Sequence, residues 1–77
     1  MKINRPYFYV WRSYRLMIAN PDTTRFRWAF AHACKWAFQE IGTSQLLTHM
    51  AEKEIIPARM YHLAGRVSEG NVDWIEN

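Results

Sequence analysis

Four stretches of the chain repeat apolar side chains at helical spacing, and residues that start or stop helices separate them. The separating residues are Asn20-Pro21, Gly42, Pro57 and Gly70-Asn71. This pattern predicts an all-α fold, a small bundle of three to four short helices joined by tight turns. At 77 residues, the range 1–77 is expected to form a single helical domain.

The first predicted helix runs from about Pro6 to Ala19. Its inward face is expected to be formed by apolar and aromatic residues at helical spacing: Tyr7, Val10/Trp11, Tyr14 and Met17/Ile18. Phe8, Tyr9 and Leu16 would widen this face. A strand over residues 7–11 is the alternative, because aromatic residues and valine also favour strands. The helix is preferred because the spacing persists as far as Ile18.

The second predicted helix has the strongest end signals. Asn20 suits the N-cap, Pro21 suits the first helical position, and Gly42 suits the end. One face of this helix would carry Phe26, Phe30, Ala33, Ala37 and Ile41, with Phe30 inward. Another would carry Trp28, His32, Lys35/Trp36 and Gln39. A helix with large aromatic residues on two faces is either buried on both or uses one to bind.

Two shorter helices are predicted in the second half of the chain. One starts with Thr43 or Ser44 as N-cap and carries an apolar stripe of Leu46/Leu47, Met50 and Ala51. The other starts at Pro57 and ends before Gly70, with Met60, Leu63/Ala64 and Val67 facing inward. The tail over residues 72–75 is apolar enough that we expect it to pack back onto the core.

Charge and aromatic residues are distributed unevenly between the two halves. Residues 1–38 hold ten of the twelve aromatic residues and carry a net charge of +6, whereas residues 39–77 carry −3. Such a basic half favours an acidic partner, which can be nucleic acid, a phosphate-rich membrane surface or an acidic protein face. The alternative is that both halves are ordinary solvated surface.

Cys34 is the only cysteine, so neither a disulfide framework nor a structural zinc site is expected. A single reduced cysteine indicates a cytoplasmic protein. Neither a signal peptide nor a transmembrane segment is expected, because Arg12 and Arg15 interrupt the first apolar run and no run reaches membrane length.

The sequence offers no catalytic constellation, so we expect neither an enzyme nor a cofactor. His32 and Cys34 are two positions apart, which places them about 200° apart around a helix. The serines lie in no nucleophile elbow, and there is no glycine-rich phosphate loop.

Residues 45–66 partly match a degenerate helix-turn-helix, in which Arg59 and His62 would face the major groove. Ile55 occupies the turn position that glycine usually fills, and Leu63 falls on the inward face. The segment also lies in the acidic half of the chain. A plain helical hairpin is the preferred interpretation.

The aromatic and basic N-terminal half is the predicted binding region. Its large aromatic residues supply the candidates for the core, and we expect most of these seven to be buried: Phe8, Trp11, Tyr14, Phe26, Phe30, Trp36 and Phe38. The expected partner-binding residues are Tyr9, Arg12, Arg15, Arg25, Arg27 and Trp28, since arginine and aromatic residues dominate binding hot spots.

These features predict a small non-enzymatic protein that docks onto a larger protein or protein–nucleic-acid complex as a modulator or inhibitor. Nucleic-acid metabolism is one class of target, by analogy in size and composition with small accessory proteins of mobile elements. Direct DNA or RNA binding is the runner-up. A homo-oligomer that uses the spare aromatic residues is the third reading, and binding to a membrane surface is the weakest.

Overall fold

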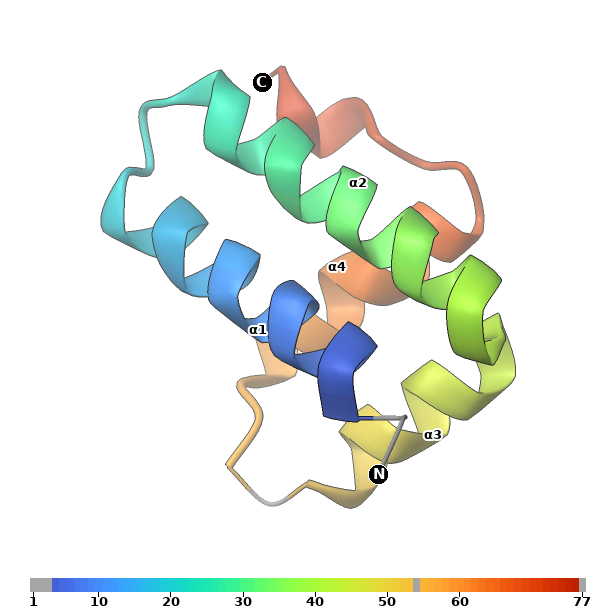
Figure 1. Ribbon diagram of the computed structural model, residues 1–77. Coiled ribbons are helices and arrows are strands. Elements are labelled where there is room, and N and C mark those ends of the chain that lie inside the picture. Colours follow the sequence, from blue (N-terminus) through green and yellow to red (C-terminus); the bar gives the residue numbers. More distant parts are fainter. Residues whose placement is uncertain (1–3, 54, 77) are drawn as a thin grey trace.

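The computed structural model describes residues 4–53 and 55–76, which form four α-helices and one short 3-10 helix (Figure 1). The elements are α1 (Asn4–Ala19), α2 (Thr24–Ile41), α3 (Thr43–Glu52), α4 (Ala58–Ser68) and η1 (Asp73–Ile75). The all-α prediction is confirmed. Residues 7–11 lie inside α1, so the strand alternative is wrong.

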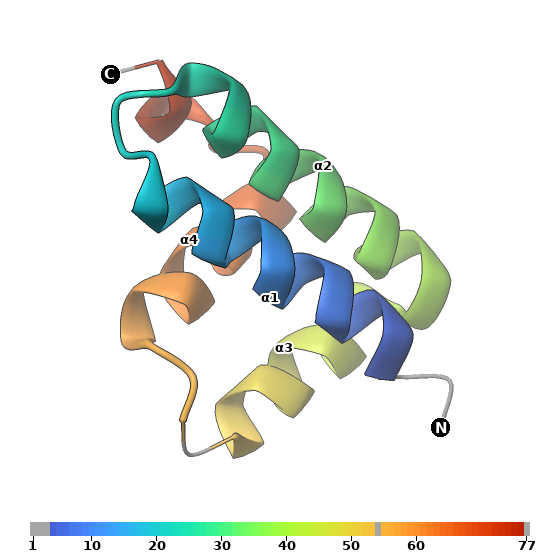
Figure 2. The ribbon, with the colours of Figure 1, turned by 60° about the vertical axis from the view of Figure 1, so that its left-hand side comes forward.

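The helices form two layers. Helices α1 and α2 run antiparallel beside each other, α4 lies behind them, and α3 lies at the end where α1 begins and α2 ends (Figures 1 and 2). The central element is α2, which packs against α1, α3, α4 and η1. The principal helical neighbour of α1 is α2, so much of the circumference of α1 faces solvent.

All five elements contribute to one core. Its buried residues are Val10, Tyr14 and Met17 of α1; Phe30, Ala31, Cys34 and Ala37 of α2; Leu46 and Met50 of α3; Met60, Leu63, Ala64 and Val67 of α4; and Ile75 of η1. Phe30 is fully buried, as its position in the sequence predicted. Its ring contacts those of Tyr14 and Trp74 edge-on, with centroids 5.8 Å and 6.1 Å away.

The predicted start of the second helix is wrong, because α2 begins at Thr24 and residues 20–23 form a turn. Asn20 completes α1 instead of capping α2. Its backbone N–H and its side-chain Nδ2 both donate to the carbonyl oxygen of Leu16, at 3.1 Å and 2.9 Å. The N–H of Thr23 then donates to the carbonyl of Asn20 at 3.1 Å and closes the turn.

A single residue, Gly42, joins α2 to α3. Its N–H donates to the carbonyl of Phe38 at 2.8 Å, and its own carbonyl accepts from the N–H of Leu46 at 3.1 Å. The φ angle of +91° that this junction requires is open to glycine and strained for other residues. Gly42 therefore ends α2 as predicted and also takes the N-cap position of α3 that was expected for Thr43 or Ser44.

The C-terminal segment packs back on the core, as predicted. Ile75 is fully buried, and the indole Nε1 of Trp74 donates to the carbonyl of Asn71 at 3.0 Å. This segment lies beside the N-terminal half of α2 in both ribbon views (Figures 1 and 2).

Candidate binding surface

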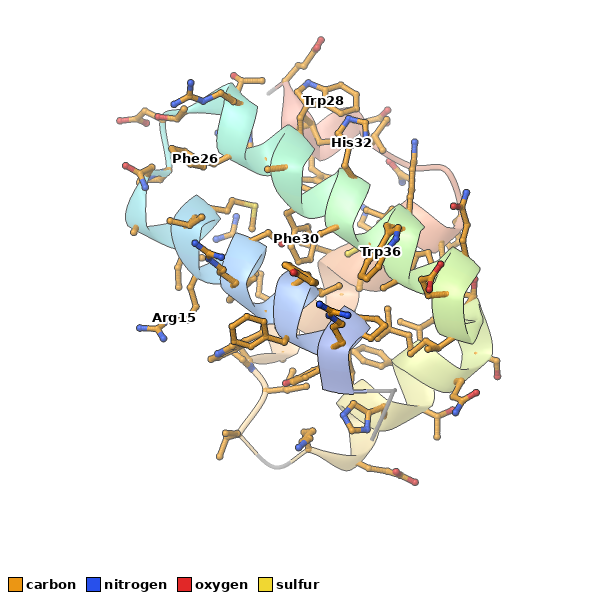
Figure 3. All side chains as sticks on the ribbon, viewed as in Figure 1. Arg15, Phe26, Trp28, Phe30, His32 and Trp36 are labelled. Atoms are coloured by element: carbon orange, nitrogen blue, oxygen red, sulfur yellow. The ribbon has the colours of Figure 1, made fainter. Side chains whose placement is uncertain are left out.

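The six predicted partner-binding residues do not share one surface. Tyr9, Arg12 and Arg15 lie on the solvent side of α1, where Arg15 points away from the body of the protein (Figure 3). Arg25 lies near the start of α2, and its guanidinium carbon is 5.3 Å from the centroid of the Phe26 ring. Trp28 lies close to the C-terminal segment (Figure 3). The predicted residues of α2 therefore do not join those of α1 in one surface.

The Arg27 side chain forms hydrogen bonds within the fold and stabilises it. Its guanidinium donates to the carbonyl oxygens of Ile75 and Pro21 and to Oγ1 of Thr24. One side chain thus ties the C-terminal segment to the turn between α1 and α2. Because all three guanidinium nitrogens of Arg27 already donate to acceptors within the fold, we leave Arg27 outside the candidate surface.

Trp28 is also a partial member of the core. It is half-buried and packs against the buried cluster, and its ring lies 6.0 Å from that of His32. This position is remote along α2 from Trp36, which points toward the viewer in Figure 3. We therefore leave Trp28 outside the candidate surface as well.

The outward side of α1 carries a continuous basic and apolar strip. Val10, Tyr14 and Met17 are buried at helical spacing, which turns the opposite side of the helix to solvent. We call that opposite side the α1 face; it consists of Arg5, Phe8, Tyr9, Arg12, Arg15 and Leu16. Phe8 is 53% exposed and Leu16 is 42% exposed. Single exposed apolar residues are ordinary, but these two lie together with Tyr9 on one side of one helix and form an apolar patch among the arginines.

The arginines of the α1 face have no anionic neighbour on their own helix, since α1 contains no Asp or Glu. Within residues 4–53 and 55–76, the side chains of Arg5, Arg12 and Arg15 make no ion pair and no hydrogen bond. Each exposed guanidinium therefore keeps five N–H donors for an external acceptor. Carboxylate and phosphate oxygens are the acceptors that match this geometry.

A shallow hollow of about 460 Å³ runs along the α1 face. Its lining comes from α1 alone: Phe8, Trp11, Arg12, Arg15, Leu16 and Ala19. Trp11 is half-buried and stacks on Tyr14 with centroids 6.3 Å apart, so its ring is supported by the core. The hollow thus combines an apolar lining with two cations.

Exposed aromatic rings extend this surface onto α2. The ring of Tyr9 meets that of Trp36 edge-on at 5.5 Å and that of Phe8 at 5.9 Å. A second open hollow, of about 360 Å³, is lined by Tyr9, Ala33 and Trp36. Trp36 is 38% exposed, so the α1 face continues without interruption into an aromatic patch at the junction of the two helices.

Sequence reasoning missed three members of this surface. Phe8 and Trp36 were expected in the core, and Leu16 was expected to widen the buried side of α1. The structure buries only the narrow stripe formed by Val10, Tyr14 and Met17, so the residues opposite its centre face solvent. The width of the covered stripe depends on how the helices pack and cannot be read from the spacing alone. Of the other aromatic residues considered for the core, Tyr14 and Phe30 are buried, whereas Trp11, Phe26 and Phe38 are only half-buried and pack against it.

The titratable side chains of the described residues form no reactive cluster. Burial raises the pKa of the Cys34 thiol to about 12, so it stays protonated at neutral pH. His32 is exposed on α2, whereas His49 is half-buried with its ring 4.9 Å from that of Tyr7. In the described part of the chain, His, Cys, Asp and Glu nowhere gather in a group of three or more that suits a metal ion.

The hairpin of α3 and α4 exposes Arg59 and His62, whereas Leu63 is only 7% exposed. Leu63 is thus buried, as its periodicity indicated. Among the described helices, none combines the length and the apolar character needed to cross a membrane.

Comparisons with known proteins assign nothing to this surface. No family model, no curated protein and no solved structure matches the chain. What the α1 face can bind therefore follows from its own side chains, which offer arginine donors beside exposed apolar groups.

Proposed function

We propose that the chain is a small non-enzymatic binding protein that docks its α1 face onto an acidic surface of a larger protein and modulates or inhibits that protein. The observation that carries this proposal is the combination of exposed Phe8 and Leu16 with Arg12 and Arg15, which have no partner among the described residues. Apolar side chains gain from burial, and arginines gain from pairing with carboxylates in the same contact.

The mixture of side chains favours a protein over nucleic acid as the partner. Phosphate groups would satisfy the arginines, and bases would stack on Phe8 or Tyr9. An aliphatic side chain such as Leu16 gains most where another apolar surface covers it, which is worth about 1.5–3 kcal/mol for full burial. Because the face is cationic, it complements an acidic site on the partner and not a basic groove that holds nucleic acid.

The cytoplasm is the proposed place of action, on the basis of the single buried cysteine. Proteins of nucleic-acid metabolism are the class of target that we favour, by analogy in size and composition with small accessory proteins of mobile elements. On such a protein the α1 face would occupy an acidic site. The competing function is direct binding of the chain to DNA or RNA.

Fluorescence anisotropy with random-sequence oligonucleotides separates the two functions. A surface that binds phosphates loses affinity steeply with salt, by about 0.7–0.9 log units per log unit of salt for each phosphate contacted. We expect little binding at physiological salt. Sub-micromolar affinity that survives physiological salt would replace the protein partner with nucleic acid.

Affinity capture from a lysate of the source organism, with and without nuclease, tests the proposed surface itself. We expect wild type to retain a discrete protein after nuclease treatment, and Arg12→Glu to lose it. Arg59→Glu on α4 is the matched control, because Arg59 is also an exposed helical arginine but lies outside the α1 face. Equal capture by wild type and Arg12→Glu would contradict the assignment of the surface.

A further inference from the structure

Resting on this proposed function, we infer that the partner presents an acidic amphipathic helix, which lies in the hollow along α1. The six lining residues of the hollow form two parallel rows on one helix. Phe8, Arg12 and Leu16 make one row, and Trp11, Arg15 and Ala19 make the other, each with a spacing of four positions. The hollow is therefore the groove between two adjacent i±4 ridges of α1.

A groove of this kind is the shape into which a second helix packs one of its own ridges. It extends from Phe8 to Ala19, which is about 16 Å along the axis at 1.5 Å per residue, or three turns. Peptide helices that bind in such grooves do so with apolar anchors at positions i, i+3/i+4 and i+7. The apolar ends of the two rows, Phe8 and Leu16 on one side and Trp11 and Ala19 on the other, provide contacts for these anchors.

The charges of the groove determine the character of the occupant. Arg12 lies at the centre of one wall and Arg15 at the centre of the other. A helix whose apolar ridge is flanked by carboxylates on both sides would pair with both arginines at once. A second copy of α1 cannot do so, since that helix contains arginines and no Asp or Glu. Like charges across such an interface are unfavourable, so charge complementarity selects an acidic helix.

The test is a titration of the full chain, followed by amide NMR shifts, with a synthetic helical peptide of about five turns. The peptide carries leucine at every fourth position, glutamate on both sides of that row, and alanine and glutamine elsewhere. A peptide of the same composition in scrambled order and a version with lysine for every glutamate are the controls. We expect shifts confined to residues 8–19 and their contacts on α2, and weaker or no binding of the scrambled peptide.

The variants Arg12→Glu and Arg15→Glu should each lower affinity for the acidic peptide at least about tenfold and raise affinity for the lysine peptide. Arg59→Glu should change neither. Absence of shifts in α1 at millimolar peptide, equal binding of the scrambled peptide, or shifts confined to α4 would overturn the inference. Binding of wild type to vesicles containing phosphatidylserine that is lost in Arg12→Glu would also overturn it, because a lipid surface would then cover the groove.

The peptide titration and the capture experiment test different claims, so a negative result in one can be distinguished from a negative result in the other. If Arg12→Glu loses the captured protein but no acidic helical peptide binds, the inference about the helix is wrong and the proposed function stands. If Arg12→Glu retains the captured protein, the proposed function itself is wrong.

Discussion

The two arginines near the start of α2 provide a stability test within a single turn of helix. Arg25 is exposed and its guanidinium lies over the Phe26 ring, whereas Arg27 bridges Pro21, Thr24 and Ile75. Arg27→Ala removes three charge-assisted hydrogen bonds and with them the bond that holds the C-terminal segment containing the buried Ile75. Arg25→Ala removes the same chemical group from the same helix and leaves those contacts in place.

The expected cost of Arg27→Ala follows from these contacts. A hydrogen bond from a charged donor contributes about 1.5–3 kcal/mol when sheltered and less in contact with water. Because Arg27 is half-buried and its three bonds form one unit, we expect a loss of about 2–3 kcal/mol in the free energy of unfolding. For a domain of this size, that loss lowers Tm by roughly 8–24 °C. Arg25→Ala should lie within about 0.5 kcal/mol of wild type, as surface substitutions usually do.

Urea unfolding followed by far-UV circular dichroism measures both variants, and hydrogen exchange of the amides in residues 73–75 reports the local effect. Arg27→Lys should recover only part of the loss, because an ammonium group is a point charge and cannot reproduce the planar fork. A result in which Arg27→Ala and Arg25→Ala unfold at the same urea concentration would refute the role of Arg27 as a structural tie.

Two further predictions concern the core. Phe30→Ala should cost about 3–5 kcal/mol, since a fully buried ring is lost, and either fail to fold or melt far below wild type; Phe8→Ala, whose ring is 53% exposed, is the control. A melting temperature of Phe30→Ala close to that of wild type would contradict the inward position of the ring. Burial raises the pKa of Cys34 from its ordinary value of 9.0 to about 12, so stability should be intact below 9.0 and decline as pH rises toward 12. Cys34→Ala should show a smaller decline in urea unfolding measured between neutral pH and about pH 10.5, and an equal decline in both proteins would contradict the shift.

The sequence predicted three to four helices, most of their ends and most of the buried positions, because these features depend on local spacing and on Gly and Pro. The start of α2 was missed for a local reason as well. Asn20 can cap a following helix or close the preceding one, and here its side chain bonds back to Leu16. Nothing in the sequence around Asn20-Pro21 distinguishes these two geometries.

The candidate surface was harder to predict, because it depends on which elements meet. Apolar residues surround more than half of α1, and only the packing shows that Phe8 and Leu16 lie outside the covered stripe. Arg27 resembles the other arginines in the sequence, yet its acceptor at Ile75 is 48 positions away. Local patterns carry no information about a bond of that range.

Photo-crosslinking in living cells tests the central claim, that the α1 face is where the partner docks. The photoreactive residue p-benzoylphenylalanine is placed at Phe8, which is 53% exposed on the α1 face, or at Tyr61, which is 40% exposed on α4. We expect a discrete crosslinked protein from position 8, its loss when Arg12→Glu is added, and no such product from position 61. Crosslinking to a protein from position 61 but not from position 8, or crosslinking of position 8 only to nucleic acid or lipid, would contradict the claim.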